Sequence, residues 1–135
     1  SQAAGTEKIG GEELTVLVVE DQGDQRALLQ RFLQKDGHTV VLAEGGREAL
    51  EKLEAETFDL VITDRAMPDM NGDAIAAAAK ELDPKLPVIM LTGFGDIMEA
   101  SGECPVGVDL ILSKPITVEK MEKAIRTALE DAENT

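Results

Sequence analysis

Some polar side chains in this sequence follow short apolar runs, at the point where each run ends. They are Glu20, Asp21, Asp64, Thr92 and Lys114. Short apolar runs bounded by turn signals are typical of buried strands, and ligands of open α/β sheets bind beyond the carboxyl ends of such strands. We therefore expect these side chains to meet at one edge of a parallel sheet, although they lie far apart in the sequence.

Three of these side chains are carboxylates, which at close range repel one another and raise at least one pKa unless a cation joins them. Mg²⁺ prefers oxygen ligands and typically takes one or two carboxylates together with water and a phosphate oxygen. Asp21 and Asp64 suit direct ligands, and Glu20 suits a contact through water. The backbone carbonyl of Ala66 could complete the set. The pattern thus predicts a magnesium site.

The same residue types are those that phosphoryl transfer needs. Lys114 supplies a positive charge and Thr92 a hydroxyl donor for the oxygens of a transferred phosphoryl group. Asp64 would then be the nucleophile and become an acyl phosphate. Each residue alone has a simpler explanation, because Asp64 could start a turn and Lys114 could be a solvated lysine. Glu20 and Asp21 could simply cap a helix.

The apolar periodicity predicts five strands that alternate with five helices. Strands are expected at residues 14–19, 39–43, 58–64, 87–91 and 108–112. Helices are expected to begin near Gly23, Gly46, Asp73, Asp96 and Thr117. Strict alternation of this kind implies an α/β fold, in which a doubly wound parallel sheet has right-handed crossovers and helices on both faces.

Local signals give expectations for single residues. Gly37 is expected to end the first helix in the left-handed conformation, and Gly72 to supply a residue tolerant of positive φ in the loop after Asp64. Leu82 is expected on the inner face of the third helix. His38, the single histidine, is expected on the surface, at the sheet edge opposite Asp64.

Length and composition limit the class of protein. A chain of 135 residues with 43% hydrophobic residues suits one folded domain and excludes a disordered chain. A net charge of −14 and the absence of Trp and Tyr argue against binding of nucleic acid or of an anionic membrane. We expect residues 1–13 to be a flexible linker or leader, 14–131 the domain and 132–135 an acidic tail.

Cysteine content and hydropathy indicate the compartment. The single cysteine, Cys104, cannot form an internal disulfide and is expected to be a small apolar filler, which suits the reducing cytosol. No apolar stretch approaches the ~20 residues of a membrane span. The expected location is therefore the cytoplasm, without membrane insertion.

Several segments together resemble the receiver domain of two-component signalling. They read VVED at 18–21, TDRAMP at 63–68 followed by Gly72, LTG at 91–93 and SKP at 113–115. The resemblance covers about residues 14–129, in the family's order. It implies a flavodoxin-like (βα)5 fold with strand order 2-1-3-4-5, a phosphoaspartate at Asp64 and a cis Lys114–Pro115 peptide. It also implies a histidine kinase or histidine phosphotransfer domain as phosphodonor.

Two features depart from the usual pattern of that family. Ile111 stands where receivers that drive an output usually carry an aromatic switch residue, whereas the aromatic Phe94 lies in the loop after the fourth strand. Residues 101–107 contain two glycines and a proline, which should shorten the fourth helix. Together these two features favour a relay role, or signalling by another surface. Residues 92–96 and 106–116 are similar to receivers attached to hybrid sensor histidine kinases.

Two other functions use part of the same pattern. A phosphatase of the haloacid dehalogenase kind also has an acid at a strand end, but it normally needs a second acid two residues later, where Ala66 stands. A receiver-like module that acts independently of phosphorylation has typically lost an acid or the lysine, and none is lost here. The sequence therefore favours a phosphoacceptor over both, and it carries no signal for an oligomeric state.

Overall fold

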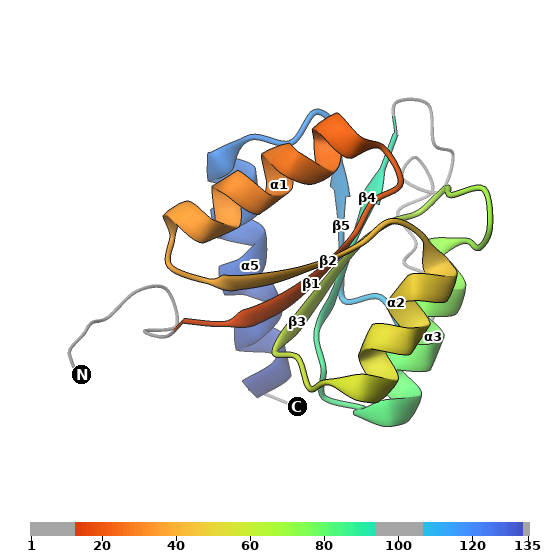
Figure 1. Ribbon diagram of the computed structural model, residues 1–135. Coiled ribbons are helices and arrows are strands. Elements are labelled where there is room, and N and C mark those ends of the chain that lie inside the picture. Colours follow the sequence, from red (N-terminus) through yellow and green to blue (C-terminus); the bar gives the residue numbers. More distant parts are fainter. Residues whose placement is uncertain (1–12, 94–106, 134–135) are drawn as a thin grey trace.

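The computed structural model describes residues 13–93 and 107–133, and within them it has one five-stranded sheet with helices on both faces (Figure 1). The strands are β1 Thr15–Val19, β2 Thr39–Ala43, β3 Leu60–Asp64, β4 Val88–Thr92 and β5 Leu110–Ser113. The helices are α1 Gly23–Lys35, α2 Gly46–Ala55, α3 Gly72–Leu82 and α5 Val118–Glu133. From β1 to β4 strands and helices alternate as the periodicity predicted, and α5 follows β5, whereas the predicted fourth helix lies outside the described residues.

The strand order is β2-β1-β3-β4-β5, and every pair is parallel, which confirms the predicted flavodoxin-like topology. The chain starts in β1, moves outward to β2 and returns past β1 to β3. This change of direction leaves a crevice beyond the carboxyl ends of β1 and β3, where ligands of such sheets bind.

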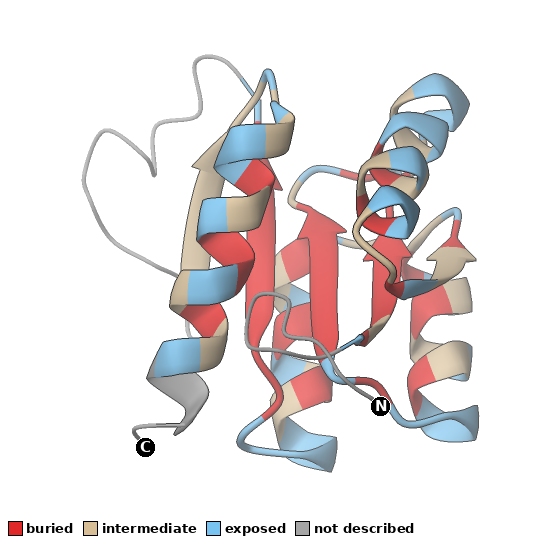
Figure 2. Cartoon of the chain, turned by 90° about the vertical axis from the view of Figure 1, so that its left-hand side faces the viewer, coloured by how far each residue is buried: buried red, intermediate tan, exposed pale blue. Residues whose placement is uncertain are grey.

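The core consists of two layers, one on each face of the sheet. Val61 and Met90 belong to the buried cluster beneath α2 and α3, whereas Ile62 and Ile89 belong to the cluster beneath α1 and α5. Neighbouring strand residues therefore alternate between the two layers, as the period of a strand requires. The central strands are buried throughout (Figure 2). These buried strands fix the positions of the residues at their carboxyl ends, Asp64 and Thr92.

Two local expectations are confirmed. Gly37 has a φ of 91° just after α1, so it ends that helix in the left-handed region. The Lys114–Pro115 peptide is cis. The predictions for Phe94, for the helix from Asp96 and for Cys104 concern residues outside the described part of the chain.

His38 is buried, so the expectation of a surface residue was wrong. Its side chain is only 6% exposed, and its Nδ1 accepts a hydrogen bond of 3.1 Å from the backbone N–H of Leu14. The turn at Gly37 directs the chain back against the start of β1, and this places the imidazole between the beginnings of two neighbouring strands. No sequence period signals such a contact.

Leu82 also differs from its expected position. It is 56% exposed at the last residue of α3, whereas Ile75, Ala76 and Ala79 of that helix are fully buried. Leu82 is the last residue of α3, where the helical period alone does not decide burial. Among the described residues, no helix is long and apolar enough to cross a membrane.

The two helical leucines Leu33 and Leu82 give a matched test of the packing. Leu33 is 1% exposed in the α1–α5 layer, so Leu33→Ala should lower the free energy of unfolding by about 2–5 kcal/mol. Leu82→Ala should cost less than about 1 kcal/mol, because little area leaves the core. Urea unfolding of both variants measures the difference, and equal losses would contradict the structure.

Candidate functional site

The register of the sheet brings the predicted polar residues to one edge. Val19 of β1 pairs with Thr63 of β3, so Glu20 and Asp64 follow at the same level on neighbouring strands. Thr92 of β4 pairs with Ser113 of β5, the residue before Lys114. Four strand ends thus deliver their polar groups side by side.

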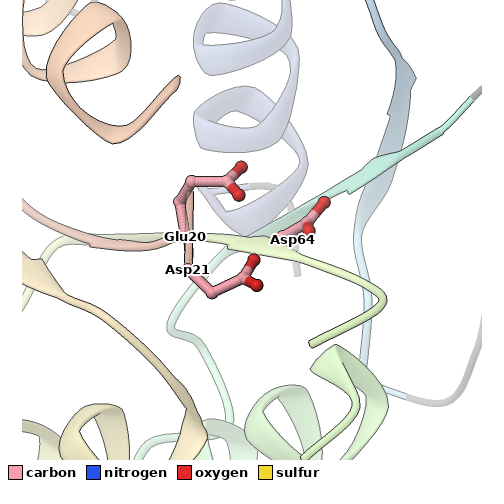
Figure 3. A group of neighbouring side chains, drawn as sticks. All are labelled: Glu20, Asp21 and Asp64. Atoms are coloured by element: carbon pink, nitrogen blue, oxygen red, sulfur yellow. The ribbon is translucent and has the colours of Figure 1, made fainter. Parts of the chain in front are cut away.

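Glu20, Asp21 and Asp64 form one carboxylate cluster. Each offers a carboxylate oxygen, and these oxygens all lie within 4.8 Å of one another. Figure 3 shows the three side chains gathered at the ends of neighbouring strands. Glu20 is fully buried, Asp64 is 7% exposed and Asp21 is half-buried. Negative charge is therefore concentrated where water reaches it poorly.

Lys114 is the cation of this cluster. Its Nζ lies 3.1 Å from Asp64 Oδ1 and 3.3 Å from Glu20 Oε1, so one ammonium group bridges two strands. The backbone holds it there, because the N–H of Lys114 donates to the carbonyl of Thr92 at 2.9 Å. The lysine side chain is 21% exposed, which leaves it access to an incoming group.

Burial and mutual repulsion disturb the titration of these groups. Desolvation by burial raises the pKa of Asp64, against the attraction of Lys114, and Asp21 adds to the rise. Desolvation also raises the pKa of Glu20, and the charge of Asp64 raises it further. Desolvation lowers the pKa of Lys114, but contacts with Asp64 and Glu20 outweigh it and leave that pKa raised. The cluster holds more negative charge than one lysine compensates.

Contacts in the β1–α1 turn hold Glu20 in place. Its Oε2 accepts a hydrogen bond from the N–H of Gln22 at 3.2 Å, and its backbone carbonyl accepts one from Arg26 Nη1 at 2.8 Å. Arg26 also lies 3.6 Å from Glu44. The sequence reasoning did not single out Arg26, because an arginine on the first turns of a helix carries no signal of its own.

The remaining predicted residues surround the cluster. Thr92 is fully buried at the end of β4, and its Oγ1 donates to the carbonyl of Leu112 at 3.4 Å. Ala66 is exposed in the β3–α3 loop. Ile111 is partly buried and packs against the α2–α3 layer. All of these lie at or near the carboxyl edge of the sheet, apart from Ile111, which lies within β5.

Gly72 has a different role from the expected one. Positive φ occurs at two described glycines, Gly37 and Gly107, so Gly72 does not supply it. Gly72 is the first residue of α3, and a Cβ there would lie 2.5 Å from the carbonyl oxygen of Asp64. Its N–H donates to the carbonyl of Arg65 at 2.7 Å. Glycine is needed for this close approach of two backbone segments.

The donor set fits a hard divalent cation. Such ions take carboxylate oxygens, and the three acids present these from two strand ends within a few ångströms. Burial is the first cause that raises the pKa of Asp64 and of Glu20. A cation bound at these oxygens would oppose this rise, because a nearby positive charge favours the ionised forms. Glu20, Asp21 and Asp64 are therefore the described residues that could hold a metal.

The fold and this site are those of a known family. A family model described as the response regulator receiver domain matches residues 16–126. The chain belongs to this family and is a signalling receiver domain. The resemblance to receiver domains that the sequence shows is thereby confirmed.

Similar proteins include regulators and isolated receivers. The chain is 38% identical over 117 residues to the transcriptional regulatory protein GlrR of Escherichia coli, covering 87% of this chain and 26% of GlrR. It is 34% identical to the response regulator receiver protein CpdR of Brucella abortus, over 84% of this chain and 95% of CpdR. The chain thus spans about a quarter of GlrR and nearly all of CpdR.

A solved structure of a similar protein has the same fold. The chemotaxis protein CheY4 of Vibrio cholerae superposes with a TM-score of 0.79 at 31% identity, covering 87% of this chain and 100% of CheY4.

The raised pKa of Asp64 gives a prediction for stability. Its folded-state pKa lies above the ordinary 3.8, first because of burial, so the folded wild type binds more protons than the unfolded chain and loses stability as pH rises through that window. Without divalent cations, Asp64→Asn should therefore raise the free energy of unfolding at neutral pH. The gain should shrink towards pH 3.8.

Urea unfolding across this pH range measures the effect. Asp83→Asn is the control, because Asp83 is exposed at the opposite end of the sheet, and it should show no such gain. A neutral-pH loss of stability in Asp64→Asn would contradict the electrostatic account.

Proposed function

We propose that this domain accepts one phosphoryl group on Asp64 from a phosphohistidine, supplied by a histidine kinase or a histidine phosphotransfer domain. The observation that carries the proposal is the contact of Lys114 Nζ with Asp64 and Glu20 at the edge where the third carboxylate, Asp21, also lies. The nucleophile Asp64, the cation Lys114 and a set of oxygen donors for a divalent metal therefore lie in one place.

The roles of the side chains follow from the chemistry of the transfer. An Asp64 carboxylate oxygen forms a bond to phosphorus while the phosphorus–nitrogen bond of the phosphohistidine breaks, and the imidazole leaves with that electron pair. Lys114 stabilises the negative charge on the phosphoryl oxygens. Thr92 donates its hydroxyl hydrogen to one of these oxygens, exchanging its present acceptor, the carbonyl of Leu112.

The metal of the proposal is Mg²⁺, which when bound supplies positive charge to the phosphoryl oxygens. Asp21 and Asp64 would hold it directly, Glu20 through water, and the backbone carbonyl of Ala66 would complete the protein ligands. The mutual proximity of the three carboxylate oxygens supports this set. The exposed position of Ala66, two residues after Asp64, is compatible with it.

We propose a signalling role without turnover of a separate substrate. The domain would promote its own phosphorylation and dephosphorylation. Turnover of a separate substrate is not expected, since Ala66 offers no carboxylate at the position where phosphatases of the haloacid dehalogenase kind carry their second acid. The acids and the lysine are all in place, and this favours a phosphoacceptor over an interaction module that works independently of phosphorylation.

The proposed domain spans residues 14–131, after a linker at 1–13 and before an acidic tail at 132–135. A histidine kinase uses ATP, so we propose that the domain works in the cytoplasm. Attachment to a hybrid kinase stays a prediction, because GlrR is named a transcriptional regulatory protein and CpdR a receiver protein.

Phosphorylation by a small donor tests the proposal directly. Incubation of the chain with Mg²⁺ and acetyl phosphate should add the mass of one phosphoryl group, measured on the intact protein. Asp64→Asn should abolish the addition, because the amide is not a nucleophile towards phosphorus. Asp83→Asn, which removes an exposed carboxylate far from the site, should leave it unchanged.

Two outcomes would contradict the proposal. One is a wild-type chain that takes up no phosphoryl group either from acetyl phosphate or from phosphohistidine donors, which would favour the phosphorylation-independent module. The other is an Asp64→Asn variant that is phosphorylated as readily as the wild type, which would place the acceptor elsewhere. Steady release of phosphate from added phosphomonoesters would favour a phosphatase.

A further inference from the structure

Helix α2 begins without a capping side chain of its own. Its N-cap residue is Gly45, which has no side chain, although the first amides of a helix need acceptors from outside the helix. The acceptor is Asp69, from the loop between β3 and α3. Its Oδ1 accepts the N–H of Gly46 at 3.0 Å and its Oδ2 accepts that of Arg47 at 3.1 Å, across 23 and 22 residues of sequence.

The two glycines leave room for this contact. A Cβ on Gly45 would lie 3.0 Å from Asp69 Oδ1, and a Cβ on Gly46 would lie 2.4 Å from the Cβ of Met70. Two successive residues of the loop therefore pack against two successive residues at the start of α2. Gly46, which in the sequence predicted only the start of a helix, is together with Gly45 also a contact surface.

The hydrogen bonds keep Asp69 charged. Donation from the Gly46 amide and then from the Arg47 amide lowers the pKa of Asp69 below its ordinary 3.8. A carboxylate at this position is also favoured by the partial positive charge of the helix N-terminus. The loop is thus attached to α2 by two charge-assisted hydrogen bonds at neutral pH.

The other end of the loop is attached to the sheet. The N–H of Arg65 donates to the carbonyl of Leu91 at 2.9 Å, and the carbonyl of Arg65 accepts from Gly72 at 2.7 Å. Met67 is 7% exposed and lies in the buried cluster beneath α2 and α3. Ala66 therefore lies between a backbone anchor at Arg65 and a side-chain anchor at Asp69.

We propose that Asp69 is a positioning residue for metal binding: by capping α2 it holds the β3–α3 loop so that the Ala66 carbonyl can bind the metal held by Asp21 and Asp64. The inference rests on the proposed function, which assigns that carbonyl to the metal. Asp69 acts through the loop and is not itself a ligand. A groove of about 380 Å³, lined by Asp21, Pro68 and Asp69 among others, runs along the same contact.

Calorimetric titration of the unphosphorylated chain with Mg²⁺ tests this inference. Asp69→Ala removes both hydrogen bonds and should weaken Mg²⁺ binding about tenfold, as loss of a residue that orients metal ligands commonly does. Asp69→Asn retains one acceptor oxygen and should recover part of that affinity. Hydrogen exchange at the Gly46 and Arg47 amides should be faster in Asp69→Ala, which verifies that the cap is lost.

Two control variants separate positioning from other effects. Glu51→Gln removes a charge from the same groove without touching the cap, and Asp83→Ala removes an exposed carboxylate that accepts the N–H of Lys85. Both should bind Mg²⁺ within about twofold of the wild type. If Glu51→Gln weakened Mg²⁺ as much as Asp69→Ala, charge rather than position would be responsible and the inference would be wrong.

Failure of this inference is distinguishable from failure of the proposed function. Unchanged Mg²⁺ affinity in Asp69→Ala, with fast exchange at Gly46, would overturn the positioning role while wild-type phosphorylation on Asp64 still stood. A wild-type chain that binds Mg²⁺ but takes no phosphoryl group would overturn the proposed function alone. Circular dichroism at the titration temperature confirms that each variant is folded before its affinity is compared.

Discussion

The contact of one ammonium group with two carboxylates is the interaction on which the site depends. Lys114 lies 3.1 Å from Asp64 and 3.3 Å from Glu20, while Asp21 adds a third negative charge close by. Buried charges need partners, since desolvation otherwise disfavours their ionised forms. Strand order makes this partnership possible: β5 carries the cation to the edge where β1 and β3 bring the acids. The net excess of negative charge is what makes the site receptive to a divalent cation.

The core serves this edge by keeping the strand ends in register. Val61 and Ile62 face opposite layers, so β3 is fixed from both faces before it ends at Asp64. Groups held on such strands keep their mutual geometry better than groups held on loops alone. The reacting groups lie at the strand ends, outside both layers, so the charge of Asp64 can change without changing the packing that holds its strand.

The strand ends could be predicted from sequence because each apolar run marks its own end, and parallel topology then brings those ends together. Contacts between segments that share no period could not be predicted. Asp69 caps a helix 22 residues before it, and His38 accepts from an amide 24 residues before it. Leu82 has the period of a core residue, but it is the last residue of α3 and is mostly exposed. Gly72 is needed for a close backbone approach that only the folded loop creates.

Because Ile111 has no aromatic ring, the loop after Asp64 is the better candidate for a segment that responds to a change at the site. A bound or transferred group can favour one conformation only where it makes different contacts in two states. Ile111 is an aliphatic residue packed on the α2–α3 layer, whereas the loop contacts the site at one end and α2 at the other, through Asp69 and Met70. A change at Asp64 that moves this loop must strain or release the start of α2. This contact connects the carboxylate edge to the start of α2 through the stretch of chain from Asp64 to Asp69.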